Sequence, residues 1–186
     1  MNINELNAHI IDWAKERELD TKGTVEAQAI KTVEELSELI KAICKDKKED
    51  IIDSIGDVYV TLVIGNMLDK YIVADLLYGE MNLLFDDKAK KNCRKLGKTK
   101  QLDDLAEIMR LVLKYKYESY ILRVLTYQLI EVAYLYKLNF TKCVESAYNT
   151  IKDRKGKLVN GTYVKDEDLQ NEITDIFFGR PTNANH

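Results

Sequence analysis

The sequence predicts an all-α protein, and two observations carry this prediction. Pro181 is the single proline among 186 residues and glycine is sparse before residue 156, so little in the body of the chain interrupts a helix. Apolar residues recur at spacings of three and four, as in Val33, Leu36, Ile40 and Ile43, which is the period of a buried helix face. At 46% hydrophobic residues, the chain can form one well-packed domain. We therefore expect a four-helix-type core with additional helices and a short C-terminal hairpin.

The expected elements follow from this periodicity and from the polar stretches between the apolar ones. Thr24 is a suitable N-cap for the second helix, and a basic, polar linker over 86–100 separates two helical blocks. After Lys157 the pattern changes to a hairpin that turns at Asn160 and Gly161. Helices are expected at 3–18, 25–46, 49–68, 71–84, 101–116, 118–137 and 140–153.

We expect these elements to form one domain over residues 1–170. It combines acidic, metal-binding helices in 1–85 with a second helical block in 101–157, and a tail over 171–186 follows. The second block is rich in tyrosine and leucine, which we interpret as packing and interface residues. A helical pair with one polar, functional face commonly completes its bundle with a second copy of itself across a symmetry axis. We therefore expect a homodimer or a dimer of dimers.

Composition argues against several classes of partner. The net charge is −3, from 28 basic and 31 acidic residues, which does not favour nucleic-acid binding. The longest apolar run, 58–67, is too short to cross a bilayer. The amino terminus lacks the features of a secretory signal, so a cytoplasmic location is expected. Three distant cysteines, Cys44, Cys93 and Cys143, are typical of reduced thiols packed in helices.

Two acidic stripes predict a metal site. Glu35 and Glu38 share one face of the second helix, within roughly 80° on the helical wheel together with Gln28 and Lys31. Asp50, Asp53 and Asp57 share one face of the next helix, within roughly 60°. Facing carboxylates repel unless a hard cation joins them, and Mg²⁺, or alternatively Mn²⁺, is the usual occupant of an oxygen-ligand site.

The alternative interpretation is a solvated helix face with i,i+4 charge pairs. Asp57 argues against it, because the apolar run 58–64 that follows implies burial on several sides. A carboxylate at such a position needs a cation or several donors to offset its desolvation.

A basic segment near the end of the last predicted helix is the second candidate binding element. Lys152, Arg154 and Lys155 lie close together, and arginine suits bidentate phosphate contacts. The alternative is compensation of the helix dipole before a glycine stop. Asn149 and Asn160 are candidates for contacts to a base or sugar. Lys31 reaches either a phosphate or Glu35, and Trp13 either stacks on a base or packs in the core.

These motifs together resemble the MazG-like branch of the all-α nucleotide pyrophosphohydrolases. The resemblance covers residues 5–68 and 145–168, and it rests on the residues Trp13, Gln28, Lys31, Glu34, Glu35, Glu38, Asp57, Asn149, Lys152, Arg154, Lys155 and Lys157. It implies Mg²⁺-dependent cleavage of a nucleoside triphosphate between the α and β phosphates, which releases a monophosphate and pyrophosphate.

The chemistry of a triphosphate suits these residues, because hydrolysis of a polyanion needs cations that neutralise phosphate oxygens and activate water. Glu35, Glu38 and Asp57 are the candidate ligands, and Asp53 is a substitute or outer partner. Glu34 is a ligand or a base that orients water.

The sequence departs from the family pattern at one position. Ser54 stands where the family's second acidic motif has glutamate, so the resemblance does not supply the whole ligand set. This departure supports a rival hypothesis from another class: a helical nucleotide-binding or regulatory protein with weak or no turnover.

Overall fold

The computed structural model describes residues 1–69, 74–95, 97–159 and 161–166, and within them the chain is helical apart from one hairpin. The prediction of an all-α fold with a C-terminal hairpin is confirmed. The elements are α1 (Ile3–Glu16), α2 (Leu19–Lys22), α3 (Val25–Cys44), α4 (Lys48–Asp69), α5 (Ala74–Leu84), α6 (Asp87–Cys93), α7 (Lys98–Tyr115), α8 (Ser119–Leu135), α9 (Phe140–Ile151), β1 (Gly156–Val159) and β2 (Thr162–Lys165).

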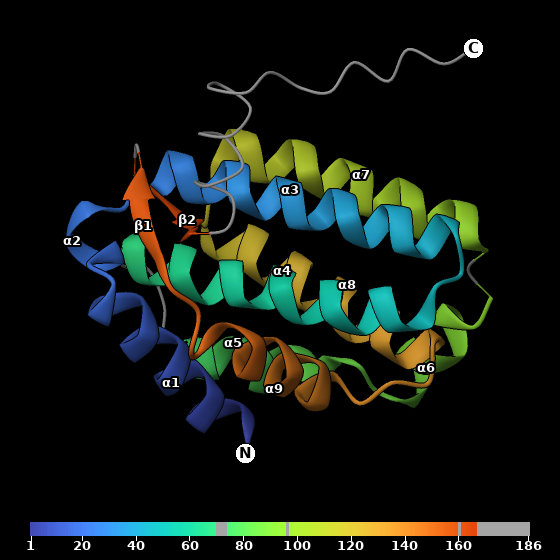
Figure 1. Cartoon of the computed structure of the whole chain (residues 1–186). Coiled ribbons are helices and arrows are strands. Elements are labelled where there is room, and N and C mark those ends of the chain that lie inside the picture. The colour runs from blue at the N-terminus through green and yellow to red at the C-terminus, as the bar shows by residue number, and fades with distance from the viewer. Residues whose placement is uncertain (70–73, 96, 160, 167–186) are drawn as a thin grey trace, which may run out of the picture.

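Four helices, α3, α4, α7 and α8, form the central bundle. Helix α3 packs against α4 and α7, and α8 packs against the same two helices. In Figure 1, α1, α5 and α9 lie on the side of α4 and α8 that faces away from α3 and α7. Helix α4 therefore has neighbours on opposite sides, and the whole run from Val58 to Asn66 is buried. This explains why that run is apolar nearly all round.

Helix α4 is also the one described helix that is long and apolar enough to cross a membrane by length and composition. Of its most apolar window, 72% is buried inside the protein. That burial is the pattern of a core helix and is consistent with a soluble protein.

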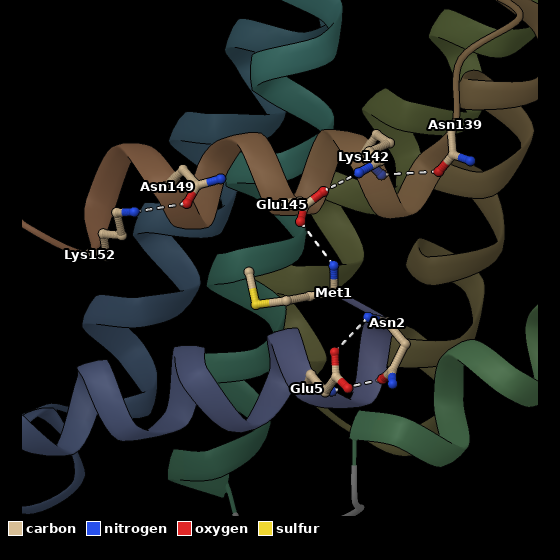
Figure 2. Close-up of polar contacts among 8 residues, drawn as sticks. All are labelled: Met1, Asn2, Glu5, Asn139, Lys142, Glu145, Asn149 and Lys152. Carbon is tan, nitrogen blue, oxygen red and sulfur yellow. Dashed lines mark hydrogen bonds and ion pairs between the residues drawn. The ribbon is translucent and has the colours of Figure 1, made fainter.

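Side chains satisfy the free amides at several helix starts. Thr24 accepts a hydrogen bond from the amide of Ala27, as the sequence predicts for this cap. Asn2 and Glu5 form a reciprocal capping box on α1, and Figure 2 shows both of its bonds. Asn139 caps α9 by accepting from the amide of Lys142. Local sequence thus sets where these helices begin.

Several element boundaries differ from the predicted ones by two or three residues, such as the start of α7 at Lys98 in place of residue 101, and α6 is missing from the predicted helices. The linker predicted over 86–100 contains α6, which Asp86 caps and which packs on α8. Its apolar face is only Ala89 and Cys93, four residues apart among lysines, and so its helical period is weak in the sequence. The first helix ends at Glu16 instead of residue 18, because Glu18 adopts a left-handed conformation with φ 58°. The tail, 171–186, lies outside the described residues.

The core stripe of α3 is rotated slightly from the predicted one. Leu36 and Ile43 are fully buried, as expected, whereas Val33 and Ile40 are only partly buried. Leu39 is fully buried as well, because α3 packs against two helices of the bundle.

Helix α9 lies unusually close to α4 because Gly56 has no side chain. A Cβ at this position would overlap the carbonyl oxygen of Cys143 and lie 2.6 Å from Cβ of Ala147. The hairpin follows α9 directly, with Leu158 paired to Tyr163, and its turn residue Gly161, at φ 81°, lies against Thr24. The packing at Gly56 thus helps place the hairpin beside the start of α3.

We expect Gly56→Ala to destabilise the protein by about 1–3 kcal/mol, because backbone of α9 must move to admit the methyl group. The measurement is the free energy of unfolding in urea. Gly79→Ala is the matched control: Gly79 lies in α5 with nothing within 4 Å of the added Cβ. This control should be neutral or stabilising by up to about 1 kcal/mol. Equal stability of the two variants would contradict the close approach of α4 and α9.

Candidate functional site

A cavity of about 320 Å³ lies between α3, α4, the end of α9 and the hairpin. Carboxylates line one side of this cavity, basic side chains line another, and the rest of its wall is largely apolar. The carboxylates are Glu34, Glu35, Glu38 and Asp57; the cations are Lys31, Arg154 and Lys165; the amide and hydroxyl groups are Gln28 and Thr61; the apolar and aromatic residues are Trp13, Leu19, Val60, Ile64, Ile151, Tyr163 and Val164.

The acidic side comes from the two stripes predicted on α3 and α4. Lys31 bridges two of its carboxylates: Nζ is 2.8 Å from Oε1 of Glu35 and 2.9 Å from Oε2 of Glu34. The side chain of Glu35 is only 11% exposed, whereas that of Glu34 is 56% exposed. Burial alone would lower the pKa of Lys31, but its bonds to Glu35 and Glu34 outweigh burial and raise it. Lys31 therefore remains charged and holds both carboxylates.

Asp57 faces this pair from α4 in a less favourable environment. Burial, followed by the charge of Glu35, raises the pKa of Asp57 to about 6. Arg154 acts in the opposite direction, and so does Lys165 more weakly. These two cations do not fully compensate the desolvation. The ionised form of Asp57 is therefore costly near neutral pH when no further cation is present.

The apolar end of the cavity lies along α4, beyond Asp57. Val60, Thr61 and Ile64 follow on the same helix face, and the seven residue steps from Asp57 to Ile64 span about 10 Å. Gln28 approaches from α3 and donates from Nε2 to the carbonyl of Thr61 at 3.1 Å. The cavity thus changes from charged to apolar over the length of a small molecule.

Trp13 forms part of the apolar wall and is itself mostly buried. Its indole Nε1 donates to the carbonyl of Ile151 at 2.8 Å, and its ring meets that of Tyr163 edge to face, with centroids 5.2 Å apart. Its exposed fraction is 7%. Trp13 therefore packs in the core, which is one of its two expected roles, and it also lines the cavity, while stacking on a base stays a prediction.

Arg154 and Lys165 supply the basic side, and Lys165 is absent from the residues predicted from sequence. Tyr163 and Lys165 are two apart on β2, so strand geometry puts both side chains on the same face. That alternation links Lys165 to Tyr163, but only the folded position of the hairpin brings the two side chains to the cavity. Gly161 lies against Thr24, and β2 then follows α3 toward the acidic side.

Three predicted binding residues lie outside this cavity. Figure 2 shows Asn149 near the end of α9 and Lys152 just after it, where Nζ of Lys152 donates to Oδ1 of Asn149 at 3.1 Å. Both are exposed. Lys155 lines an adjoining surface depression that shares Arg154 and Lys165 with the cavity. Asn160 lies outside the described residues.

Asp53 and Ser54 line a depression that adjoins the cavity and shares Glu38 and Asp57 with it. Ser54 is buried, at 6% exposed, and Asp53 is exposed. Partial burial, with Asp50 and Glu49 as further causes, raises the pKa of Asp53. Asp53 thus borders the acidic side from outside, and Ser54 adds a hydroxyl without charge.

The donor chemistry of the acidic side fits a hard divalent cation, although its side chains are not arranged as a finished metal centre. Within residues 1–69, 74–95, 97–159 and 161–166, no group of three or more Asp, Glu, His or Cys side chains has that arrangement. Four carboxylates nevertheless line the same cavity, and Lys31 is the cation that now balances two of them. Carboxylate oxygens are the ligands that Mg²⁺ and Mn²⁺ prefer.

We expect Asp57→Asn to stabilise the protein in the presence of a chelator at pH 7, by up to about 3 kcal/mol. The folded protein keeps the Asp57 proton up to a pKa of about 6, above the ordinary value of 3.8, so wild-type stability falls as pH rises between these values. The advantage of the variant should vanish below pH 4. Urea unfolding across this range measures it.

Asp50→Asn is the control, because Asp50 is exposed on the same helix. An Asp57→Asn variant that is no more stable than wild type at pH 7 would contradict the cost assigned to this carboxylate.

Comparisons with known proteins identify a relative but no activity. A stretch of 63 residues is 40% identical to an uncharacterized 18.2 kDa protein encoded in the rep-hol intergenic region of Haemophilus phage HP1. The match covers 34% of this chain and 39% of the phage protein. No family model matches the chain, and no solved structure matches it.

Proposed function

We propose that this protein is a Mg²⁺-dependent nucleoside triphosphate pyrophosphohydrolase that cleaves a (d)NTP to the (d)NMP and pyrophosphate, in the manner of a nucleotide-pool housecleaning enzyme. The observation that carries the proposal is the division of one cavity into a charged end and an apolar end. About 10 Å of helix α4 separates Asp57 from Ile64, which suits a nucleotide whose base and phosphates need opposite environments.

In this proposal, the base lies at the apolar end. Trp13 offers an aromatic surface there, and Val60 and Ile64 exclude water from the base. Gln28, held by the carbonyl of Thr61, supplies a polar amide at this end. Apolar walls with few oriented polar groups are typical of small-molecule sites.

Arg154 and Lys165 bind the phosphates from the hairpin side. Arginine makes paired hydrogen bonds to phosphate oxygens, and lysine contributes a localised charge. Lys31 keeps Glu34 and Glu35 from repelling the incoming polyanion, since it neutralises part of their charge. The chain's own cations therefore surround the phosphates on two sides.

Glu35, Glu38 and Asp57 are the residues that would hold Mg²⁺, with Asp53 as an outer partner. Mg²⁺ bound there supplies positive charge that offsets both these carboxylates and the phosphate oxygens. Glu34 is more exposed than Glu35 and lies at the mouth of the cavity, where it can accept a proton from an attacking water.

The rival hypothesis is a nucleotide-binding or regulatory protein of the same fold. Two observations favour it: Ser54 brings no charge to the position of the family's glutamate, and Lys31 already satisfies Glu34 and Glu35. The two hypotheses differ in turnover and agree on binding.

We expect pyrophosphate release from one or more triphosphates in the presence of Mg²⁺, and its loss with a chelator or in Glu38→Gln. A neutral amide binds hard cations poorly, so the loss should be at least about 100-fold. A coupled pyrophosphate assay over common, oxidised and methylated (d)NTPs measures it, with folding checked by circular dichroism.

Release of inorganic phosphate in place of pyrophosphate would contradict cleavage between the α and β phosphates. A nucleotide that raises the melting temperature without any turnover would favour the rival hypothesis.

We expect Arg154→Ala and Lys165→Ala to raise KM or lower kcat for the triphosphate by about tenfold each, because both cations line the cavity. Lys152→Ala is the matched control. It removes a cation from the same basic segment, but Lys152 lies outside the cavity, bonded to Asn149. If all three variants change KM or kcat to the same extent, the cations contribute only overall positive charge. The assignment of Arg154 to the phosphates then fails.

The proposal includes self-association as a homodimer or a dimer of dimers. The support is a set of large apolar side chains on the surface of α7 and α8: Leu113 is 46% exposed, Tyr115 37% and Tyr120 66%. Light scattering at micromolar concentration should report a species of at least twice the 21.5 kDa chain mass. A monomer across this range would exclude that part of the proposal.

A further inference from the structure

Arg17, at the end of α1, is bonded to the turn that carries Arg154. Its Nη2 donates to the carbonyl of Arg154 at 3.0 Å and to that of Lys152 at 3.4 Å, and its Nη1 donates to the carbonyl of Trp13 at 3.1 Å. The guanidinium lies over the Trp13 ring, 4.5 Å from its centroid. Its side chain is 19% exposed, and its contact with Glu16 is a long 3.5 Å to an exposed partner. The guanidinium therefore bonds mainly to backbone carbonyls, two of which lie in the turn.

The turn after α9 needs such partners because helix geometry leaves its carbonyls unsatisfied. Three side chains from other elements supply donors. Trp13 donates to the carbonyl of Ile151, and Tyr163 donates to the carbonyl of Arg154 at 3.0 Å, beside the bond from Arg17. Two donors on one carbonyl restrict the position of Arg154 directly. Without them, the backbone at Arg154 would keep only its turn bond to the carbonyl of Ile151, with the hairpin bond from the amide of Asp166 one residue further on, at Lys155.

Arg17 does not line the cavity, whereas Trp13, Arg154 and Tyr163, the residues that it contacts or orders, all do. We propose that Arg17 is a positioning residue: it holds the turn over 152–155 so that Arg154 projects toward the phosphates beside Asp57. This inference rests on the proposed function. A planar guanidinium suits the task because its fixed fork bonds several carbonyls at once, which a lysine ammonium on a flexible stem cannot reproduce.

The test combines Arg17→Gln, Arg154→Ala and the double variant, assayed with Mg²⁺ and whichever common dNTP the wild type cleaves fastest. Arg17→Gln should lower kcat/KM by about 10- to 100-fold, because misplacing a binding group is costly even when the change is remote. If Arg17 acts through Arg154, the same change should cost less than about twofold in the Arg154→Ala background. Arg17→Lys should not restore the wild-type value.

Hydrogen exchange of the backbone amides over 152–157 provides a readout that is independent of turnover. It should accelerate in Arg17→Gln and stay unchanged in Arg110→Gln, which removes an exposed arginine bonded to Glu107 on α7. If Arg17→Gln fails to fold, Tyr163→Phe removes the other donor to the Arg154 carbonyl and should give the same pattern.

The outcomes separate the two proposals. Unchanged exchange in an active Arg17→Gln variant would overturn the positioning role, and so would losses that add fully in the double variant or wild-type kinetics in Arg17→Lys. Absence of pyrophosphate release by the wild type would instead overturn the proposed function. It would also remove the role in catalysis that is proposed for the turn over 152–155. Accelerated exchange would then report a structural clamp only.

Discussion

The rest of the site depends on one electrostatic constraint: a carboxylate, Asp57, begins the most deeply buried stretch of helix in the described structure. Asp57 itself is partly buried, and the residues that follow it on α4 are buried on all sides, so the helix cannot rotate to expose the charge further without exposing its apolar surface. Burying a carboxylate in this way is unfavourable unless positive charge is supplied. The fold supplies part of it, through Arg154 and Lys165, and leaves the pKa of Asp57 raised.

This partial compensation connects the hairpin to the acidic helices. Arg154 and Lys165 come from the end of the described chain, whereas Glu35 and Asp57 come from its first third. The link depends on packing that has no local sequence signature: Gly56 admits α9 against α4, and Trp13 bonds to Ile151 across a separation of 138 residues. Folding therefore brings opposite charges together at one end of the cavity.

The same distinction explains how much could be predicted from sequence. Glu35, Glu38 and Asp57 were predictable as neighbours, because they lie on two consecutive helices whose periodic faces can be computed. Thr24 was predictable as a cap for a local reason as well. Helix α6 was not predictable, because two apolar positions among lysines give too weak a helical period. The place of Lys165 in the site was not predictable either, because it depends on where the hairpin lies in the fold.

The basic segment after α9 shows the limit of reasoning from charge density. Lys152, Arg154 and Lys155 look equivalent in the sequence, yet only Arg154 lines the cavity. The difference arises from backbone geometry after the helix ends, where Tyr163 and Arg17 both bond the carbonyl of Arg154. Contacts made by the main chain, which the residue types do not reveal, decide which of three neighbouring cations lines the cavity.

Lys31 shows how several carboxylates can line one cavity in a stable fold. Its bonds to Glu34 and Glu35 offset the repulsion between carboxylates in the absence of any ligand, which lets the bundle pack around an acidic side. Its side chain is flexible and 28% exposed, so these bonds can be exchanged for others at small cost. The carboxylates it holds are therefore kept in place without being permanently neutralised, whereas the charge of Asp57 is balanced only in part, by Arg154 and Lys165.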